Sequence, residues 1–130
     1  MLSIIPPQTL GEWLAWSSAL ITIVFGLICF FAPRTTYRIL RLETRPDVPE
    51  AVSESRATMA GFYLGAGILA ILFQQPFVWM VLGAGWAFTA LGRLVSIVVD
   101  RGNTRFNWGS LVFEAALAAA PLAFALGYIR

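Results

Sequence analysis

Two charged residues stand inside long apolar stretches of the sequence, Arg93 and Glu114. Arg93 lies seven positions before Asp100, and Glu114 lies seven positions after Asn107. At about 1.5 Å per residue, each charge would lie roughly 10 Å along its own helix from a shared turn, so antiparallel neighbours would bring both to one depth. A guanidinium and a carboxylate so placed can form a bidentate pair. This pair either holds two helices together or handles a ligand or a proton.

Other polar residues can extend this pair into a cluster that opens toward the cytoplasm. Arg56 and Asp100 would complete a group with Arg93 and Glu114, although Arg56 can equally extend to lipid headgroups. Hydrogen-bonding side chains that can line the same cavity are those of Thr58, Tyr63, Ser96 and Asn107.

The residue types available argue against catalysis. The chain has no histidine and one cysteine, Cys29, so neither an intramolecular disulfide nor a His or Cys metal site can be assembled. A carboxylate held against a guanidinium is a poor general base at neutral pH. We therefore expect no enzyme activity, no metal and no cofactor.

The composition is that of a membrane protein with one domain, residues 1–130. The mean hydropathy is +0.76, and 12% of the residues are charged, against about a quarter in globular proteins. The net charge of +2 comes with nine arginines and no lysine, and the arginines lie between apolar segments. Membrane topology explains that placement better than nucleic-acid binding, which we exclude.

The apolar segments predict an all-α fold, an integral membrane four-helix bundle. Thr9 and Glu12 have capping-box spacing at the start of the first span, and Pro33 ends it. We expect membrane spans at about residues 10–32, 56–73, 77–99 and 107–128.

A short amphipathic helix is expected on the membrane surface at about residues 34–45. Its arginines recur at spacings of four, three and four, which would place all of them on one stripe facing anionic lipid headgroups. A cluster that only sets topology is an equally good interpretation. The arginines are Arg34, Arg38, Arg41 and Arg45.

Small residues in the second and third spans predict close helix packing. Gly61 and Gly65 have GxxxG spacing, and Gly85 and Gly92 belong to a small-residue stripe. We expect this packing inside the bundle, although the same faces can serve a homo-oligomer or a membrane protein partner.

The distribution of arginine predicts the orientation. The loops after the first and third spans hold seven of the nine, whereas the opposite side holds only Arg130. By the positive-inside rule, both termini would lie on the non-cytoplasmic side. The seven are Arg34, Arg38, Arg41, Arg45, Arg56, Arg101 and Arg105.

Several of these residues together resemble a known family. Arg56, the run Gly61-Phe62-Tyr63-Leu64-Gly65, the run Gly92 to Ser96, Asp100-Arg101-Gly102 and Glu114 are similar to a family of small bacterial four-span membrane proteins of unknown function, itself similar to the DoxX-like group. The resemblance covers about residues 10–128. It implies a four-helix fold in a bacterial inner membrane and no established activity. This chain has Asn103-Thr104 where the family's turn has a proline, which leaves the role of the turn open.

Three functions remain open, and the sequence favours the first. It is a structural or accessory protein that interacts with lipids through its arginine-rich face. The second is a small transporter, but that mechanism needs a carboxylate in the middle of the first span and little arginine bias, whereas Glu12 lies at the helix end. The third is a binder of an anionic small molecule or lipid headgroup at Arg93, because a guanidinium suits phosphate or carboxylate.

Overall fold

The computed structural model describes residues 4–130, which contain helices and turns and no strand. The helices are α1 (Leu10–Phe31), α2 (Pro33–Leu40), α3 (Glu50–Glu54), α4 (Ala60–Phe73), α5 (Pro76–Val99) and α6 (Arg105–Ala125). A π-helical turn, η1 (Ser55–Met59), joins α3 to α4 in one continuous helix. Four helices are long and apolar enough to cross a membrane: α1, Glu50–Phe73, α5 and α6. The predicted all-α bundle is confirmed.

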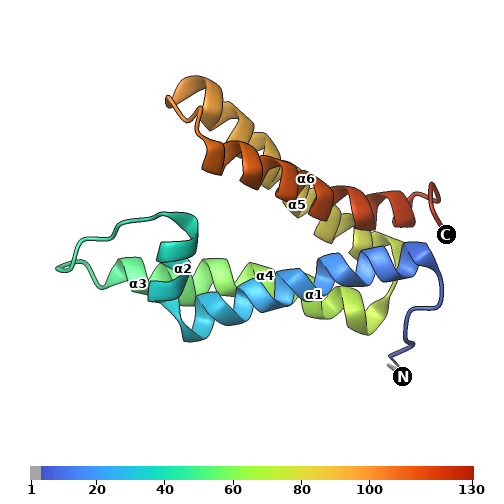
Figure 1. The fold of residues 1–130 in the computed structure, drawn as a ribbon. Coiled ribbons are helices and arrows are strands. Elements are labelled where there is room, and N and C mark those ends of the chain that lie inside the picture. The colour runs from blue at the N-terminus through green and yellow to red at the C-terminus, as the bar shows by residue number, and fades with distance from the viewer. Residues whose placement is uncertain (1–3) are drawn as a thin grey trace.

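The four long helices form two pairs, α1 with α4 and α5 with α6 (Figure 1). The pairs meet at the end that carries the α4–α5 turn and the chain termini, where α1 also packs against α6. Toward the opposite end the pairs diverge, and the short α2 lies on that side (Figure 1). This divergence makes room for a cavity between the pairs.

Hydrogen bonds donated by buried side chains hold the two pairs together. The Trp86 indole N–H donates to the Thr22 hydroxyl at 2.8 Å, which joins α5 to α1. The Ser18 hydroxyl donates to the Leu117 carbonyl at 2.7 Å, which joins α1 to α6. Ala15 and Ala19 are fully buried beside these bonds, so small residues let the helices approach. Buried polar groups of this kind need their partners, and here they specify how the pairs dock.

Local capping explains where the first and last spans begin and end. The Thr9 hydroxyl accepts the Glu12 N–H at 3.2 Å, as the capping box predicts, while the Glu12 carboxylate accepts from Gln8 rather than from Thr9. The fourth span ends at Ala125 and not near residue 128, because Gly127 turns the chain at a φ of 85°. Glycine at this position is a common helix stop.

The surface helix differs from its prediction. It ends at Leu40, because Arg41 adopts a left-handed conformation with a φ of 58° and the Leu42 N–H donates back to the Tyr37 carbonyl. Arg45 therefore lies outside the helix and pairs with Asp47 at 3.1 Å. The predicted stripe of four arginines is wrong. Only Arg34 and Arg38 lie on α2, both exposed.

The predicted packing role of the two GxxxG glycines, and of two glycines from the small-residue stripe, is also wrong within this chain. A Cβ built on any of the four would meet nothing within 4 Å, so their face is on the outside of the bundle; they are Gly61, Gly65, Gly85 and Gly92. The helices approach at other glycines. A Cβ on Gly26 would lie 2.7 Å from Leu64, and one on Gly83 would lie 2.5 Å from Leu122.

Candidate functional site

A cavity of about 510 Å³ lies where the helix pairs diverge. This volume falls in the range of about 300–1,000 Å³ that is typical of small-molecule sites. Its walls come from α1, α2, α4, α5 and α6. The lining residues are Phe25, Ile28, Cys29, Thr36, Ile39, Leu40, Tyr63, Trp86, Thr89, Arg93, Arg105, Phe106, Gly109, Ser110, Phe113 and Glu114.

Helical periodicity explains why α6 contributes most of one wall. Phe106, Gly109, Ser110, Phe113 and Glu114 are spaced at i, i+3, i+4, i+7 and i+8, so they share one face of the helix. Since Gly109 has no side chain and a Cβ there would meet nothing within 4 Å, it leaves open space in the middle of this face.

The other side of the cavity is covered by the short α2. Thr36, Ile39 and Leu40 present its apolar face to the interior, opposite the exposed Arg34 and Arg38. Tyr37 fixes the helix in place, because its hydroxyl donates to the Ala51 carbonyl at 2.6 Å. The amphipathic pattern therefore turns the helix toward the cavity.

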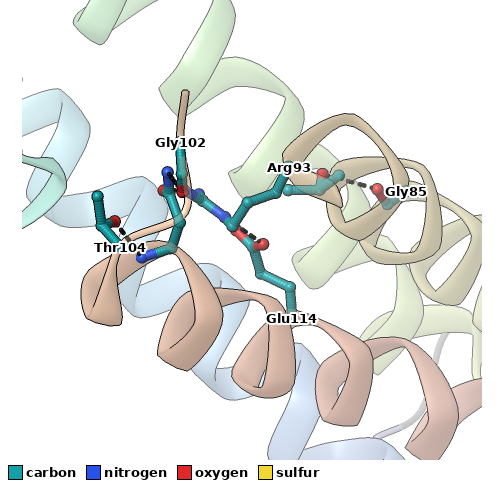
Figure 2. A network of polar contacts seen from close by, with 7 residues as sticks. Gly85, Arg93, Gly102, Thr104 and Glu114 are labelled. Atoms are coloured by element: carbon teal, nitrogen blue, oxygen red, sulfur yellow. Dashed lines mark hydrogen bonds and ion pairs between the residues drawn. The ribbon is translucent and has the colours of Figure 1, made fainter. Parts of the chain in front are cut away.

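The polar end of the cavity is the ion pair between α5 and α6 (Figure 2). Arg93 Nε lies 2.6 Å from Glu114 Oε1, and Arg93 Nη2 lies 2.8 Å from Glu114 Oε2. Arg93 Nη1 donates to Asn107 Oδ1 at 2.9 Å, and the Asn107 amide donates to the Gly102 carbonyl. The contact expected from equal depth is present, and Asn107 joins it to the α5–α6 turn.

This pair is bidentate and its two members are unequally exposed. The Glu114 side chain is 8% exposed and that of Arg93 is 21% exposed, so the guanidinium is the member that a ligand can reach. Three of the five guanidinium N–H donors are used by Glu114 and Asn107, which leaves two. A bidentate pair in a fixed orientation can present those donors without reorganisation.

Aromatic rings form the deeper wall. Tyr63 stacks on Trp86 with ring centroids 5.6 Å apart and an angle of 10° between the planes. Trp86 is itself held by Thr22, so the stack is fixed to α1. Thr89, one turn further along α5, directs its hydroxyl to the Gly85 carbonyl at 2.8 Å (Figure 2). The wall therefore offers a ligand mainly apolar surface.

Five predicted residues do not line this cavity, and one of them, Asn107, contacts the site only through Arg93. Arg56, Thr58 and Asp100 are exposed, and none lies among the lining residues. Arg56 and Thr58 belong to the π-helical turn, and Asp100 is the C-cap of α5. Ser96 does not line the cavity either, and its carbonyl accepts the Gly102 and Asp100 N–H groups of the α5–α6 turn. The predicted cluster of four charges is therefore reduced to Arg93 and Glu114.

Sequence reasoning missed Arg105 and Phe106 as site residues. Both precede Gly109 on the face of α6 that also carries Glu114. The spacing of Phe106, Ser110 and Phe113 was a usable signal, since it continues to Glu114 with a helical period.

Comparison with known proteins adds a family and no activity. No curated protein and no solved structure matches the chain. The model of one family, described as Domain of unknown function (DUF4345), matches residues 11–126. The predicted relation to the DoxX-like group stays a prediction. With almost its whole length matched, the chain belongs to the DUF4345 family, whose function is unknown.

Proposed function

We propose that this protein binds one amphiphilic molecule with an anionic headgroup between its helix pairs. The observation that carries the proposal is a cavity of about 510 Å³ whose apolar walls end at the Arg93–Glu114 pair. Such a combination of apolar wall and a few fixed polar groups is typical of ligand sites. The ligand's apolar part would lie against the Tyr63–Trp86 stack.

The charge of the site supports an anionic headgroup. Glu114 balances one guanidinium, and Arg105 adds a second positive charge to the lining. Arg93 is more exposed than Glu114, so a ligand meets the positive partner first. Guanidinium groups bind phosphate and carboxylate in a fixed planar geometry.

The second candidate is an accessory protein that interacts with lipids and a membrane protein partner or a second copy. Its support is on the outer surface. Arg34 and Arg38 are exposed on α2, where anionic headgroups can reach them, and Gly61 and Gly65 leave an open helix face. In this interpretation the Arg93–Glu114 pair serves only to hold α5 against α6.

We place the protein in a bacterial inner membrane with both termini on the non-cytoplasmic side. The arginine distribution supports this orientation, and the cavity opens near the arginine-rich loops. We do not propose a transporter, because Glu12 caps the end of α1 and no other carboxylate occurs in α1. We propose no enzymatic role, cofactor or nucleic-acid partner.

Filling the cavity tests the binding proposal. Gly109→Leu would place a large side chain in the open space of the α6 wall, and Gly85→Leu makes the same change on α5 outside the cavity. Both variants should fold, since leucine favours a helix by up to about 1 kcal/mol over glycine. In native mass spectrometry with 1-oleoyl lysophosphatidic acid, wild type and Gly85→Leu should retain one molecule and Gly109→Leu should lose it. Equal retention by all three would contradict the proposal.

A further inference from the structure

A second hollow of about 490 Å³ lies at the polar mouth of the cavity. It shares Leu40, Arg93, Arg105 and Phe106 with the cavity and adds Arg41 from the end of α2. Among the residues that the structure describes, three with guanidinium groups and none with a carboxylate line this mouth. Two of the three, those of Arg41 and Arg105, lie outside the Arg93–Glu114 pair.

Phe106 brings two of the three guanidinium groups together. The Arg41 guanidinium carbon lies 5.9 Å from the centre of the Phe106 ring, and that of Arg93 lies 6.0 Å from it. Both distances are within the range of cation–π attraction. Since Arg41 follows α2 and Phe106 belongs to α6, this contact also links the cover of the cavity to its wall.

Arg41 occupies a backbone position that favours glycine. Its φ of 58° and ψ of 42° are left-handed, and the residue ends α2 where glycine is most common. An arginine here is held in a conformation that its Cβ disfavours. Strained residues of this kind gather at functional sites.

Arg105 also occupies an unfavourable position, because a positive charge is disfavoured at the start of a helix. It is the first residue of α6, whose first turn contains no acidic residue, so its positive charge lies at the positive end of the helix. Within residues 4–130, neither Arg105 nor Arg41 forms an ion pair with a carboxylate. An anion bound at the mouth would offset both unfavourable placements.

We propose that Arg41 and Arg105 form the headgroup subsite and that it recognises a phosphate monoester on a single-chain amphiphile. The inference rests on the proposed function, because the chain of the ligand would fill the cavity described above. A phosphate monoester carries about −1.5 to −2 charges near pH 7, which matches two guanidinium groups that have no carboxylate partner. A phosphodiester carries one charge and an uncharged headgroup carries none.

The test compares two variants that make the same change. Arg41→Gly removes a guanidinium from the mouth and relieves the left-handed strain, so its melting temperature should equal or exceed that of wild type. Arg101→Gly is the control, because Arg101 also has a left-handed φ, of 55°, is exposed on the α5–α6 turn and lines neither hollow. The probes are 1-oleoyl lysophosphatidic acid and monoolein, which differ in the phosphate.

Calorimetric titration in detergent should show that wild type binds lysophosphatidic acid more tightly than monoolein. Arg41→Gly should weaken binding of lysophosphatidic acid about tenfold, the effect of one charge-assisted hydrogen bond, and leave monoolein unchanged. Arg101→Gly should bind both as wild type does. Inorganic phosphate at millimolar concentration should not displace the lipid.

The outcomes separate this inference from the proposed function. Equal losses in Arg41→Gly and Arg101→Gly would overturn the phosphate subsite alone. Equal affinity of wild type for the two lipids would overturn the phosphate subsite together with the anionic headgroup of the proposed function, and only the cavity for the apolar chain would stand. Displacement of the lipid by inorganic phosphate would show that the mouth binds free phosphate, and it would contradict an amphiphile as the ligand. If neither lipid binds, or if both still bind to Gly109→Leu, the proposed function fails and the subsite fails with it.

Discussion

Gly65 and Gly67 lie two residues apart on α4, but only Gly67 is in close contact with another helix. A Cβ on Gly67 would lie 2.7 Å from Ile23 Cγ1 and 3.0 Å from the Ala19 carbonyl oxygen, whereas one on Gly65 would meet nothing within 4 Å. The approach of α1 to α4 therefore depends on Gly67. The GxxxG face that includes Gly65 looks away from the bundle.

Alanine substitutions at these two positions should have opposite effects. Gly67→Ala forces α4 away from the backbone of α1 and should lower the free energy of unfolding by about 1–3 kcal/mol. Gly65→Ala should be neutral or stabilise by up to about 1 kcal/mol, because alanine favours a helix. Titration of the detergent-solubilised protein with dodecyl sulfate measures the free energy of unfolding of both variants. A loss at Gly65 that grows with protein concentration would instead show that its face packs against a second copy.

The Arg93–Glu114 pair should show strong coupling in a double-mutant cycle. Glu114→Ala leaves the partly exposed Arg93 guanidinium without its counter-charge and should cost about 1–3 kcal/mol of unfolding free energy. Combining it with Arg93→Ala should cost less than the sum of the two single changes. The exposed pair Arg45–Asp47, whose side chains are 78% and 67% exposed, is the control and should couple by less than about 1 kcal/mol. Additive losses at Arg93 and Glu114 would contradict a shared bond.

The orientation predicts which loops a reagent outside the cell can reach. In a Cys29→Ala background, Thr44→Cys marks the loop after α2, and Gln75→Cys marks the turn between α4 and α5. A membrane-impermeant maleimide should label Gln75→Cys in intact cells and should label Thr44→Cys only after lysis. The reverse labelling pattern would place the arginine-rich side outside the cytoplasm. The mouth of the cavity would then also face the non-cytoplasmic side.

The helices and the ion pair could be predicted from the sequence because both depend on local features of the chain. Apolar length sets the four long helices, and the Thr9 cap fixes where the first begins. Arg93 and Glu114 are each seven positions from their side of a short turn, so hairpin geometry alone brings them to one depth.

Other features depend on direction or on tertiary contacts that spacing does not encode. GxxxG spacing identifies a flat helix face but not the side to which it turns, so Gly61 and Gly65 were assigned to the wrong side. The left-handed Arg41 ends α2 early, although arginine rarely adopts that conformation. The cavity itself arises from the divergence of the two helix pairs, which no local pattern specifies.

The bond from Ser18 to Leu117 has a consequence for biosynthesis. Its two residues are 99 positions apart, so α1 reaches the translocon long before its partner exists. At about 5–20 residues per second, α1 must wait roughly 5–20 seconds in the membrane before α6 is synthesised. During that interval α4 can pack along α1, and α5 can bond to it through Trp86 and Thr22. The first helix is thus the first to enter the bilayer and among the last to complete its contacts.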